Sequence, residues 1–289
     1  MLYAKTLFAA LLAAAVLVQA EPTQTTPVSI NPHGIALKPV PQKRDAVADA
    51  PSPSVELTNA QRLARGLPLR KPSRQSKKSR QARQAAPSAC PSTAYSGIVQ
   101  VTDADTGAGL GYLPSTLNLF AEYGVTPSAE GALRVAFSAA SCAGAASQLD
   151  ILTTNGAADF PYLGLISGFA NAGTQGDLGA GSYNYAYFGS VTQTPAGSPP
   201  VTAPNSYSVA TGVPEVVESA VWTYDAASGS ISAQWVNTDG SVVATDLLYS
   251  ASDNTIVAAG DVASFRSRFG SAGTFPRLTL RLVPDGGAY

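Results

Sequence analysis

Carboxylates are the side chains in this sequence that could do acid–base chemistry, because histidine and cysteine are nearly absent. The 289 residues include one histidine, His33, and two cysteines, Cys90 and Cys142. Zinc sites built on cysteine and histidine need more of these residues than the chain holds, and His33 lies in an N-terminal segment whose removal would leave the domain without a histidine for nucleophilic catalysis. We therefore expect no metal site and no cofactor, and any hydrolysis would depend on a pair of carboxylates.

One acidic cluster resembles a catalytic motif in its residue types. Asp105-Thr106-Gly107 matches half of the aspartic protease signature, but no second Asp-Thr-Gly or Asp-Ser-Gly occurs in the chain. Asp103 and Asp105 could also offer oxygen ligands to calcium, although Ala108 stands where a calcium-binding EF-hand loop has glycine. Asp and Gly are favoured in tight turns for backbone reasons, so we predict a turn here.

A second acidic group lies near a tryptophan-containing hairpin. Glu215 and Glu218, together with Asp225 or Asp239, could form the acid and nucleophile of a glycosidase. Such a pair must lie about 5 to 9 Å apart across a cleft. The alternative is a solvated acidic rim without catalytic function, which we take as the default.

Aromatic residues give the positive indication of binding. Tyr183, Tyr185 and Tyr187 alternate along one predicted strand and therefore share a face, and Trp222 and Trp235 belong to the hairpin. Exposed aromatic rings could form a platform for sugar rings or for another protein. The alternative is that the same five side chains belong to the hydrophobic core.

Alternation of apolar and polar residues predicts strands over most of residues 87–289. The clearest segments are 95–102, 132–137, 148–153, 182–188, 220–224, 230–236 and 275–283. Clusters of Gly, Pro, Asn and Asp separate them at the short spacing of all-β domains. We predict an all-β fold, a single antiparallel β-sandwich domain with one short helix.

Two local elements can be specified further. In the hairpin, pairing Asp225 with Ser230 places Trp222 opposite Ala233. The helix would begin after Asp261, carry Phe265 and Phe269 on one face and end at Gly270.

The N-terminal third differs from this domain in composition. Residues 1–20 are typical of a secretory signal peptide that is cut after Ala20, which predicts a secreted, extracellular protein without a membrane span. Residues 21–86 hold 12 Lys and Arg against 4 acids and no aromatic residue, so we expect a disordered basic segment. His33 falls within it.

Three functions are consistent with the composition of that basic segment. It could be a pro-segment processed after Arg44 or Arg83, a retained linker or polyanion-binding arm, or a solvated spacer. Residues 87–289 hold 5 Arg, no Lys and 15 acids, which gives a net charge of −10 against +8 for residues 21–86. The arm could therefore lie on the acidic domain by charge attraction.

The two cysteines fall at Cys90 and Cys142, near the start of the domain and about 50 residues further on. In an oxidising compartment such a pair forms a structural disulfide, and two free thiols are the alternative.

Two stretches resemble a group of secreted proteins from mushroom-forming fungi. Thr58-Asn59-Ala60-Gln61-Arg62-Leu63-Ala64-Arg65-Gly66-Leu67-Pro68 resembles a linker motif of that group. Runs 181–187 and 235–241 resemble the β domain attached to the linker. The resemblance implies secretion and a fungal origin, and it carries over no functional residue.

These observations favour a non-catalytic binding or wall-associated protein whose partner is a cell-wall glycan or another extracellular protein. A carboxylate-dependent polysaccharide hydrolase and a purely structural surface protein are the alternatives. The formal net charge of −1 gives no basic excess for nucleic acid.

Overall fold

The computed structural model describes residues 28–43, 91–140, 144–173, 176–270 and 273–285. These residues form strands with two short helices, so the prediction of an all-β protein is confirmed. The strands are β1 (Ser92–Asp103), β2 (Gly109–Tyr112), β3 (Arg134–Ala140), β4 (Ala145–Leu149), β5 (Ile151–Thr153), β6 (Tyr162–Ser167), β7 (Tyr185–Val191), β8 (Val201–Thr202), β9 (Val216–Glu218), β10 (Trp222–Asp225), β11 (Ser230–Val236), β12 (Val242–Ala244), β13 (Asp246–Ser250), β14 (Thr255–Ala259) and β15 (Arg277–Pro284). The helices are α2 (Ser206–Thr211) and α3 (Val262–Phe269).

The sheet closes into a barrel instead of forming the two separate layers of the expected sandwich. Eight strands follow one another in the order β1, β3, β5, β6, β7, β14, β13 and β15, and β15 pairs with β1 to close the ring. The pairing of β1 with β15 runs antiparallel over seven residue pairs, from Gly97 opposite Pro284 to Asp103 opposite Leu278. Alternation along single strands cannot distinguish the two architectures, because both bury every second residue.

The barrel interior is the main hydrophobic core. Each of the eight ring strands contributes a buried side chain, for example Val99 of β1, Leu165 of β6, Phe188 of β7 and Leu280 of β15. Trp222 and Trp235 join the same core from β10 and β11. The predicted hairpin register is confirmed, since Trp222 pairs with Ala233.

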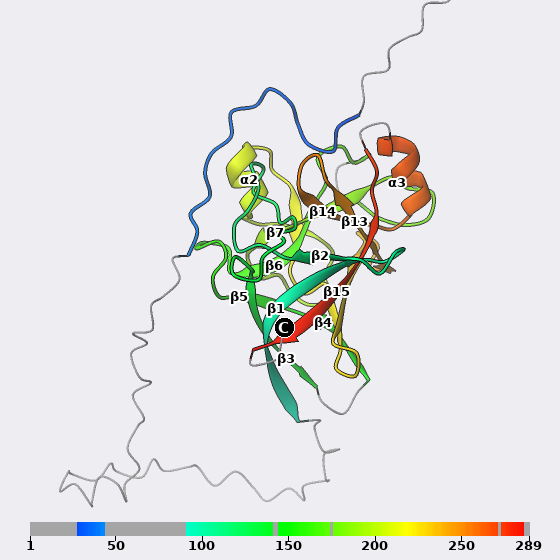
Figure 1. Cartoon of the computed structure of the whole chain (residues 1–289). Coiled ribbons are helices and arrows are strands. Elements are labelled where there is room, and N and C mark those ends of the chain that lie inside the picture. The colour runs from blue at the N-terminus through cyan, green and yellow to red at the C-terminus, as the bar shows by residue number, and fades with distance from the viewer. Residues whose placement is uncertain (1–27, 44–90, 141–143, 174–175, 271–272, 286–289) are drawn as a thin grey trace, which may run out of the picture.

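A second hydrophobic cluster covers the outside of the barrel wall around β6, β7 and β14. Tyr185 and Tyr187 of β7 pack there against Tyr207 of α2 and against Phe265 and Phe269 of α3. Every residue of β7 is therefore buried, because one face lies in the barrel and the other lies under the helices. The two helices sit at this end of the molecule (Figure 1).

The predicted helix corresponds to α3. The Asp261 side chain accepts a hydrogen bond from the Ser264 amide and caps the first turn, and Gly270 follows the last turn. Helix α2 was not predicted, because six residues show too little periodicity to identify a helix. Its cap is Asn205, whose side chain accepts a hydrogen bond from the Ser208 amide.

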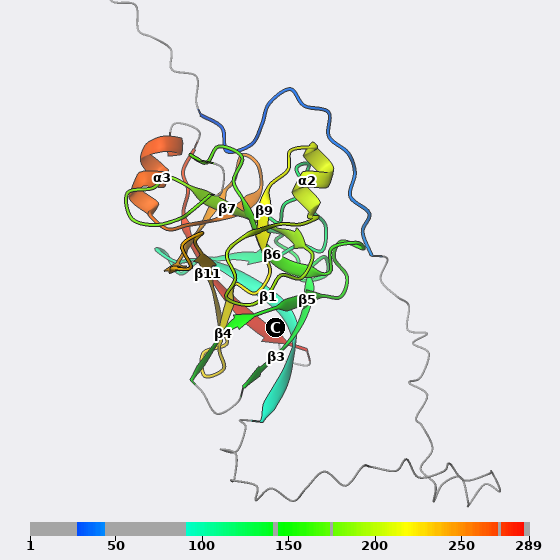
Figure 2. The same ribbon diagram turned by 180° about the vertical axis from the view of Figure 1, so that it is seen from behind.

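Residues 28–43, hereafter the N-terminal segment, lie on the domain in an extended conformation. The segment runs past α2 along the end of the molecule that carries the helices, as both views show (Figure 1, Figure 2). The expectation of disorder over residues 21–86 is therefore wrong for this part. The segment buries Ile30 and Asn31, each 2% exposed, against the domain instead of within a core of its own.

Several predicted features lie outside the described residues. These are the signal peptide, the processing sites Ala20, Arg44 and Arg83, the Thr58–Pro68 motif and the pair Cys90 and Cys142. Within the part of the chain that the structure describes, neither helix is long and apolar enough to cross a membrane.

Candidate functional site

The candidate site is built around a buried carboxyl group, Glu122, in the long connection between β2 and β3. Where β7 and β14 separate, residues 122–123 take the place of a strand. The Tyr123 amide donates to the Phe188 carbonyl at 2.8 Å, and the Ile256 amide donates to the Tyr123 carbonyl at 2.9 Å. This insertion fixes the position of the Glu122 side chain, which is fully buried.

Asn118 shapes the loop that leads into Glu122. Its Oδ1 accepts hydrogen bonds from the amides of Phe120 at 3.0 Å and Glu122 at 2.9 Å. Its Nδ2 donates to Glu122 Oε2 at 2.9 Å. One side chain thus holds both the backbone and the carboxyl group of Glu122.

Three tyrosines complete the site, and we call Glu122, Tyr185, Tyr187 and Tyr207 the tyrosine–glutamate cluster. The rings of Tyr187 and Tyr207 stack with centroids 4.9 Å apart, and the Tyr185 ring meets Tyr187 edge-on at 5.2 Å. The hydroxyls of Tyr185 and Tyr187 lie 3.1 Å apart. Burial raises the pKa values of all three tyrosines, so their hydroxyls remain neutral donors.

The two hydroxyls of β7 converge on the backbone of the N-terminal segment. Tyr185 donates to the carbonyl oxygen of Ile30 at 2.5 Å, and Tyr187 donates to the same oxygen. The hydroxyl oxygens in turn accept hydrogen bonds from the amides of Phe169 and Ala170, each at 3.3 Å. These amides orient the hydroxyls, so that both present their hydrogens to one peptide carbonyl.

Next to this carbonyl, the side chain of Asn31 contacts Glu122. Asn31 Nδ2 donates to Glu122 Oε2 at 3.3 Å, and the Asn31 amide donates to Ser29 Oγ at 3.2 Å. Pro32, which is also buried, has no amide hydrogen to satisfy. The buried tripeptide Ile30-Asn31-Pro32 therefore places few unpaired backbone groups in the interface.

Electrostatics distinguish Glu122 from an ordinary surface carboxylate. Burial raises its pKa from 4.5 to about 7, against the opposing effect of the hydrogen bonds from Asn118 and Asn31. Burial also raises the pKa of Glu215 to about 7. The negative charges of both carboxylates add to the upward shift of the Tyr207 pKa, so the two groups lie on the same side of the barrel wall.

Several polar atoms of the site are buried without a hydrogen-bond partner among the described residues. They include Glu122 Oε1, Asn31 Oδ1 and the Tyr207 hydroxyl. Buried polar groups are normally paired, and unpaired ones are typical of sites that receive ligand groups or ordered water. The cluster thus retains hydrogen-bonding capacity beyond its contacts with the N-terminal segment.

The remainder of the N-terminal segment is held mainly through its backbone. The Lys38 amide donates to the Ala210 carbonyl at 2.8 Å, and the Lys43 amide donates to the Gly156 carbonyl at 2.7 Å. The Lys43 ammonium group donates to the Thr153 carbonyl at 2.9 Å. Contacts made through the backbone depend little on side-chain identity.

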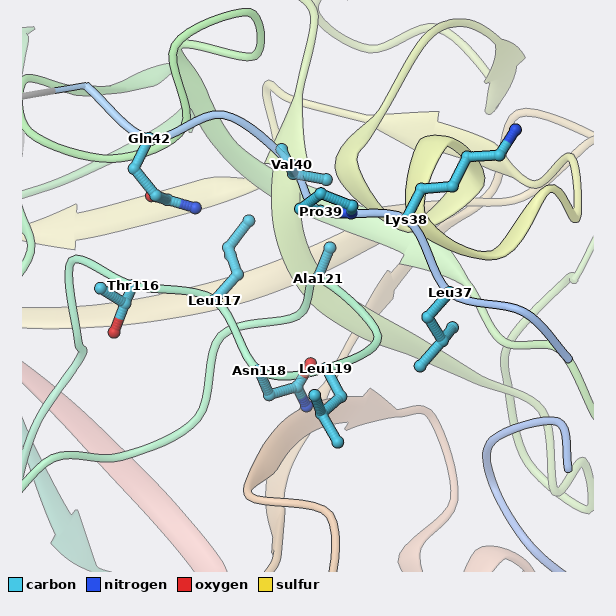
Figure 3. Close-up of a pocket in the computed structure, with 10 residues that line it drawn as sticks. All are labelled: Leu37, Lys38, Pro39, Val40, Gln42, Thr116, Leu117, Asn118, Leu119 and Ala121. Carbon is cyan, nitrogen blue, oxygen red and sulfur yellow. The ribbon is translucent and has the colours of Figure 1, made fainter. Parts of the chain in front are cut away.

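Between these anchors, a cavity of about 360 Å³ separates residues 37–42 from the loop that precedes Glu122. Leu117 and Ala121 face it from the loop, and Val40 faces it from the segment (Figure 3). The Lys38 side chain points away from the loop (Figure 3). The segment is thus tightly packed around Ile30 and loosely packed further on.

The structure gives the aromatic residues roles that differ from an exposed platform. Tyr185, Tyr187, Trp222 and Trp235 are all 0% exposed, which agrees with the core alternative. Tyr183 is half-buried, and the Arg268 guanidinium lies 5.3 Å from its ring centroid. The three tyrosines therefore do not form an open surface for sugar rings, although two of them bind a peptide carbonyl through their hydroxyls.

The carboxylates singled out from the sequence lie in two kinds of environment. Asp105-Thr106-Gly107 is a turn as predicted, in which the amides of Asp105 and Thr106 both donate to Asp103 Oδ1 at 2.9 Å. Asp225 and Asp239 likewise accept hydrogen bonds from backbone amides of their own turns. These backbone hydrogen bonds lower the pKa values of Asp103 and Asp225, and a side-chain hydrogen bond from Ser241 together with its amide lowers that of Asp239.

Glu218, the glutamate that was considered together with these aspartates, is buried instead of lying in a turn. Both carboxylate oxygens of Glu218 accept from the Val236 amide, at 3.1 and 3.2 Å, and burial raises the pKa of Glu218 to about 8. Glu218 pairs with Leu165 of β6, whose side chain faces the barrel core, whereas Val217 belongs to the outer cluster. Glu218 therefore lies on the side of β9 that faces the barrel core, whereas Glu215 lies near Tyr207 of the outer cluster.

Sequence reasoning missed Glu122 and the N-terminal segment. No motif marks Glu122, because its side-chain partners Asn118 and Asn31 are 4 and 91 positions away in the chain. An available signal was the concentration of apolar residues in this part of the basic region, where Val28, Ile30, Ile35, Leu37 and Val40 follow one another closely.

Searches against protein-family models, curated proteins and solved structures found no match to this chain.

Proposed function

We propose that the protein is an extracellular, non-catalytic binding protein that holds an extended polypeptide at the tyrosine–glutamate cluster. One observation carries the proposal: the hydroxyls of Tyr185 and Tyr187 both donate to the peptide carbonyl of Ile30. Two oriented donors on one main-chain oxygen recognise polypeptide backbone. Another extracellular protein is therefore favoured as the partner over a cell-wall glycan.

The N-terminal segment then serves as a ligand supplied by the chain itself. It is joined to the domain by 47 residues, 44–90, and its contacts are those of a bound peptide: a buried tripeptide and backbone hydrogen bonds. Secretion, which the N-terminal sequence predicts, and a fungal origin, which the resemblance of residues 58–68 implies, belong to the same proposal. The extracellular setting would supply the proteases that separate the segment from the domain.

The test uses the full chain with a site for a sequence-specific protease inserted between Arg44 and Asp45. After cutting, gel filtration and mass spectrometry show whether the N-terminal fragment remains with the domain. Retention, followed by exchange with a synthetic peptide of residues 28–43, is the expected result. Immediate loss of the fragment would overturn the proposal, and exchange with soluble glycans but not with peptide would favour a glycan partner.

A matched pair of variants connects retention to the cluster. Tyr187→Phe removes one donor to the Ile30 carbonyl, and a neutral hydrogen bond contributes about 1 kcal/mol, or roughly five-fold in affinity. Tyr183→Phe changes a tyrosine that does not contact the segment through its hydroxyl in any described hydrogen bond, and we expect no change. Equal retention in both variants would show that the hydroxyl is not a binding group.

A carboxylate-dependent hydrolase is the second candidate, supported by a different observation. Glu122 and Glu215 both have pKa values raised to about 7, and the negative charge of each raises the pKa of Tyr207. A carboxyl group that titrates near neutrality suits general acid–base catalysis. Incubating the cut protein with polysaccharides and with unfolded protein tests this candidate, and activity that is lost in Glu122→Gln would favour it over a pure binder.

A further inference from the structure

We infer that the tyrosine–glutamate cluster selects polypeptides in which an apolar residue is followed by asparagine, and that Glu122 reads the asparagine side chain. The inference rests on the proposed function and adds a sequence preference to it. Its basis is the direct contact between the side chains of Asn31 and Glu122 inside the interface.

The carbonyl of Ile30 sets the register of the bound segment. Because two hydroxyls hold this one oxygen, the peptide cannot slide by a residue without losing both donors. The side chain of Ile30 meanwhile enters the outer hydrophobic cluster with Tyr185, Tyr187 and Tyr207. The first position of the ligand is thus apolar, and its location is fixed.

The next side chain is placed against a carboxyl group in a site closed to solvent. Asn31 is 2% exposed and Glu122 is fully buried, so a side chain at this position must satisfy Glu122 without help from water. Asn31 Nδ2 is a neutral donor and satisfies this requirement. An alanine would leave Glu122 with one donor fewer, and an aspartate would bring a second carboxylate to the first.

Asn118 restricts which peptide side chains fit, because it already donates a hydrogen bond to the Glu122 carboxyl group. Asn118 Nδ2 and Asn31 Nδ2 donate to the same oxygen, Glu122 Oε2. Asn118 is held in turn by the carbonyl of Asp253 at 3.0 Å and cannot turn away to adapt to another ligand. Oε2 therefore takes one donor from the domain and one from the peptide, while Oε1 has no hydrogen-bond partner among the described residues.

The same contacts explain which residue follows the asparagine. Pro32 is buried, and a residue with an amide hydrogen would need an acceptor at that place. His33 and Gly34 are exposed, so the fully buried part of the segment ends at Pro32. The recognised element is a short apolar–Asn–Pro tripeptide, and the remaining hydrogen bonds of the segment are made mainly through its backbone.

The experiment exchanges the two polar partners in the protease-cleavable full chain. Asn31→Asp places two carboxylates in one buried site without a compensating charge, and we expect it to speed loss of the cut fragment on the order of a hundred-fold at pH 8. Asn31→Asp combined with Glu122→Gln restores a donor–acceptor pair with reversed polarity. We expect the double variant to recover to within about ten-fold of the unmodified fragment.

Ala36→Asp is the matched control, because it adds the same charge to the same segment at an exposed position. We expect less than about a two-fold change, since exposed charges interact weakly. Fluorescence of the buried Trp222 and Trp235 before cutting shows that each variant is folded. If Asn31→Asp does not fold, synthetic peptides of residues 28–43, with the unmodified sequence or with Asn31→Asp, are compared as competitors on the unmodified protein.

The outcomes separate the two proposals. If the unmodified fragment is lost at once, the proposed function fails. If it is retained and Asn31→Asp is retained equally well, the function stands and the asparagine preference is wrong. A double variant as weak as Asn31→Asp alone would likewise overturn a direct reading of Asn31 by Glu122.

Discussion

The raised pKa of Glu122 predicts that the protein is more stable in mildly acidic solution than at pH 8. A carboxyl group with a pKa of 4.5 when unfolded and about 7 when folded keeps its proton longer in the folded state. Below pH 4.5 both states are protonated and Glu122 causes no penalty. Between pH 4.5 and 7 the unfolded state ionises first, so the free energy of unfolding falls as pH rises.

The size of the effect follows from the same two values. Each pKa unit corresponds to about 1.4 kcal/mol, so the rise at Glu122 lowers the free energy of unfolding by about 3 kcal/mol once the pH exceeds 7. Glu122→Gln cannot ionise and preserves the shape and an acceptor for the two asparagines. We expect this variant to match the unmodified protein near pH 4.5 and to exceed its stability by up to about 3 kcal/mol at pH 8.

The assay is urea denaturation followed by tryptophan fluorescence between pH 4.5 and 8. Glu215 and Glu218 have pKa values raised in the same direction, so the variant should flatten the pH dependence without abolishing it. Glu130→Gln is the control at an exposed position and should leave the slope unchanged. If Glu122→Gln and Glu130→Gln give the same slope, the burial argument for Glu122 is refuted.

Three further outcomes follow from other contacts. Trp222→Phe removes the hydrogen bond from the indole to the Leu163 carbonyl at 2.7 Å and leaves a cavity in the barrel, which should cost about 2 kcal/mol by urea denaturation; a change below about 0.5 kcal/mol would contradict this. Asp261→Ala removes the cap of α3 and should cost about 1 kcal/mol, with a matching small loss of stability in thermal melts. Retention of the cut N-terminal fragment should be nearly the same in about 0.1 M and 1 M NaCl, because its described contacts are apolar or hydrogen-bonded; release by salt would show that charge attraction holds it.

Local patterns in the sequence account for much of the barrel. The hairpin register around Trp222 and the limits of α3 follow from turn residues, caps and alternation within some 15 residues. Closure of the sheet into a barrel cannot be predicted from such local patterns, because the pairing of β1 with β15 joins residues about 180 positions apart. The tyrosines of β7 show the same limit: alternation predicts one buried face, but α2 and α3 cover the other.

The N-terminal segment shows why composition alone misjudged its conformation. Residues 21–86 have no aromatic ring and are interrupted repeatedly by proline, so they cannot form a core by themselves, and that inference is sound for an isolated chain. Charge predicted that a basic arm could lie on an acidic domain, and residues 28–43 do lie there. The ion pairs among the described residues, however, join Arg134 and Arg277 to acids of the domain, and none involves the segment.

The segment is ordered by a site that the domain has already built. Tyr185 and Tyr187 are held by the barrel and by α3, and their hydroxyls are oriented by backbone amides near the end of β6. Ile30, with its carbonyl and the following Asn31, uses these groups, and Val28 packs against the same outer cluster. The conformational entropy of the site's side chains is already lost when the barrel folds. Binding must therefore compensate only for the entropy that the segment itself loses when it becomes ordered. A short, proline-containing peptide without a core of its own can therefore bind, and this is the physical reason to expect that a peptide from another protein could bind in its place.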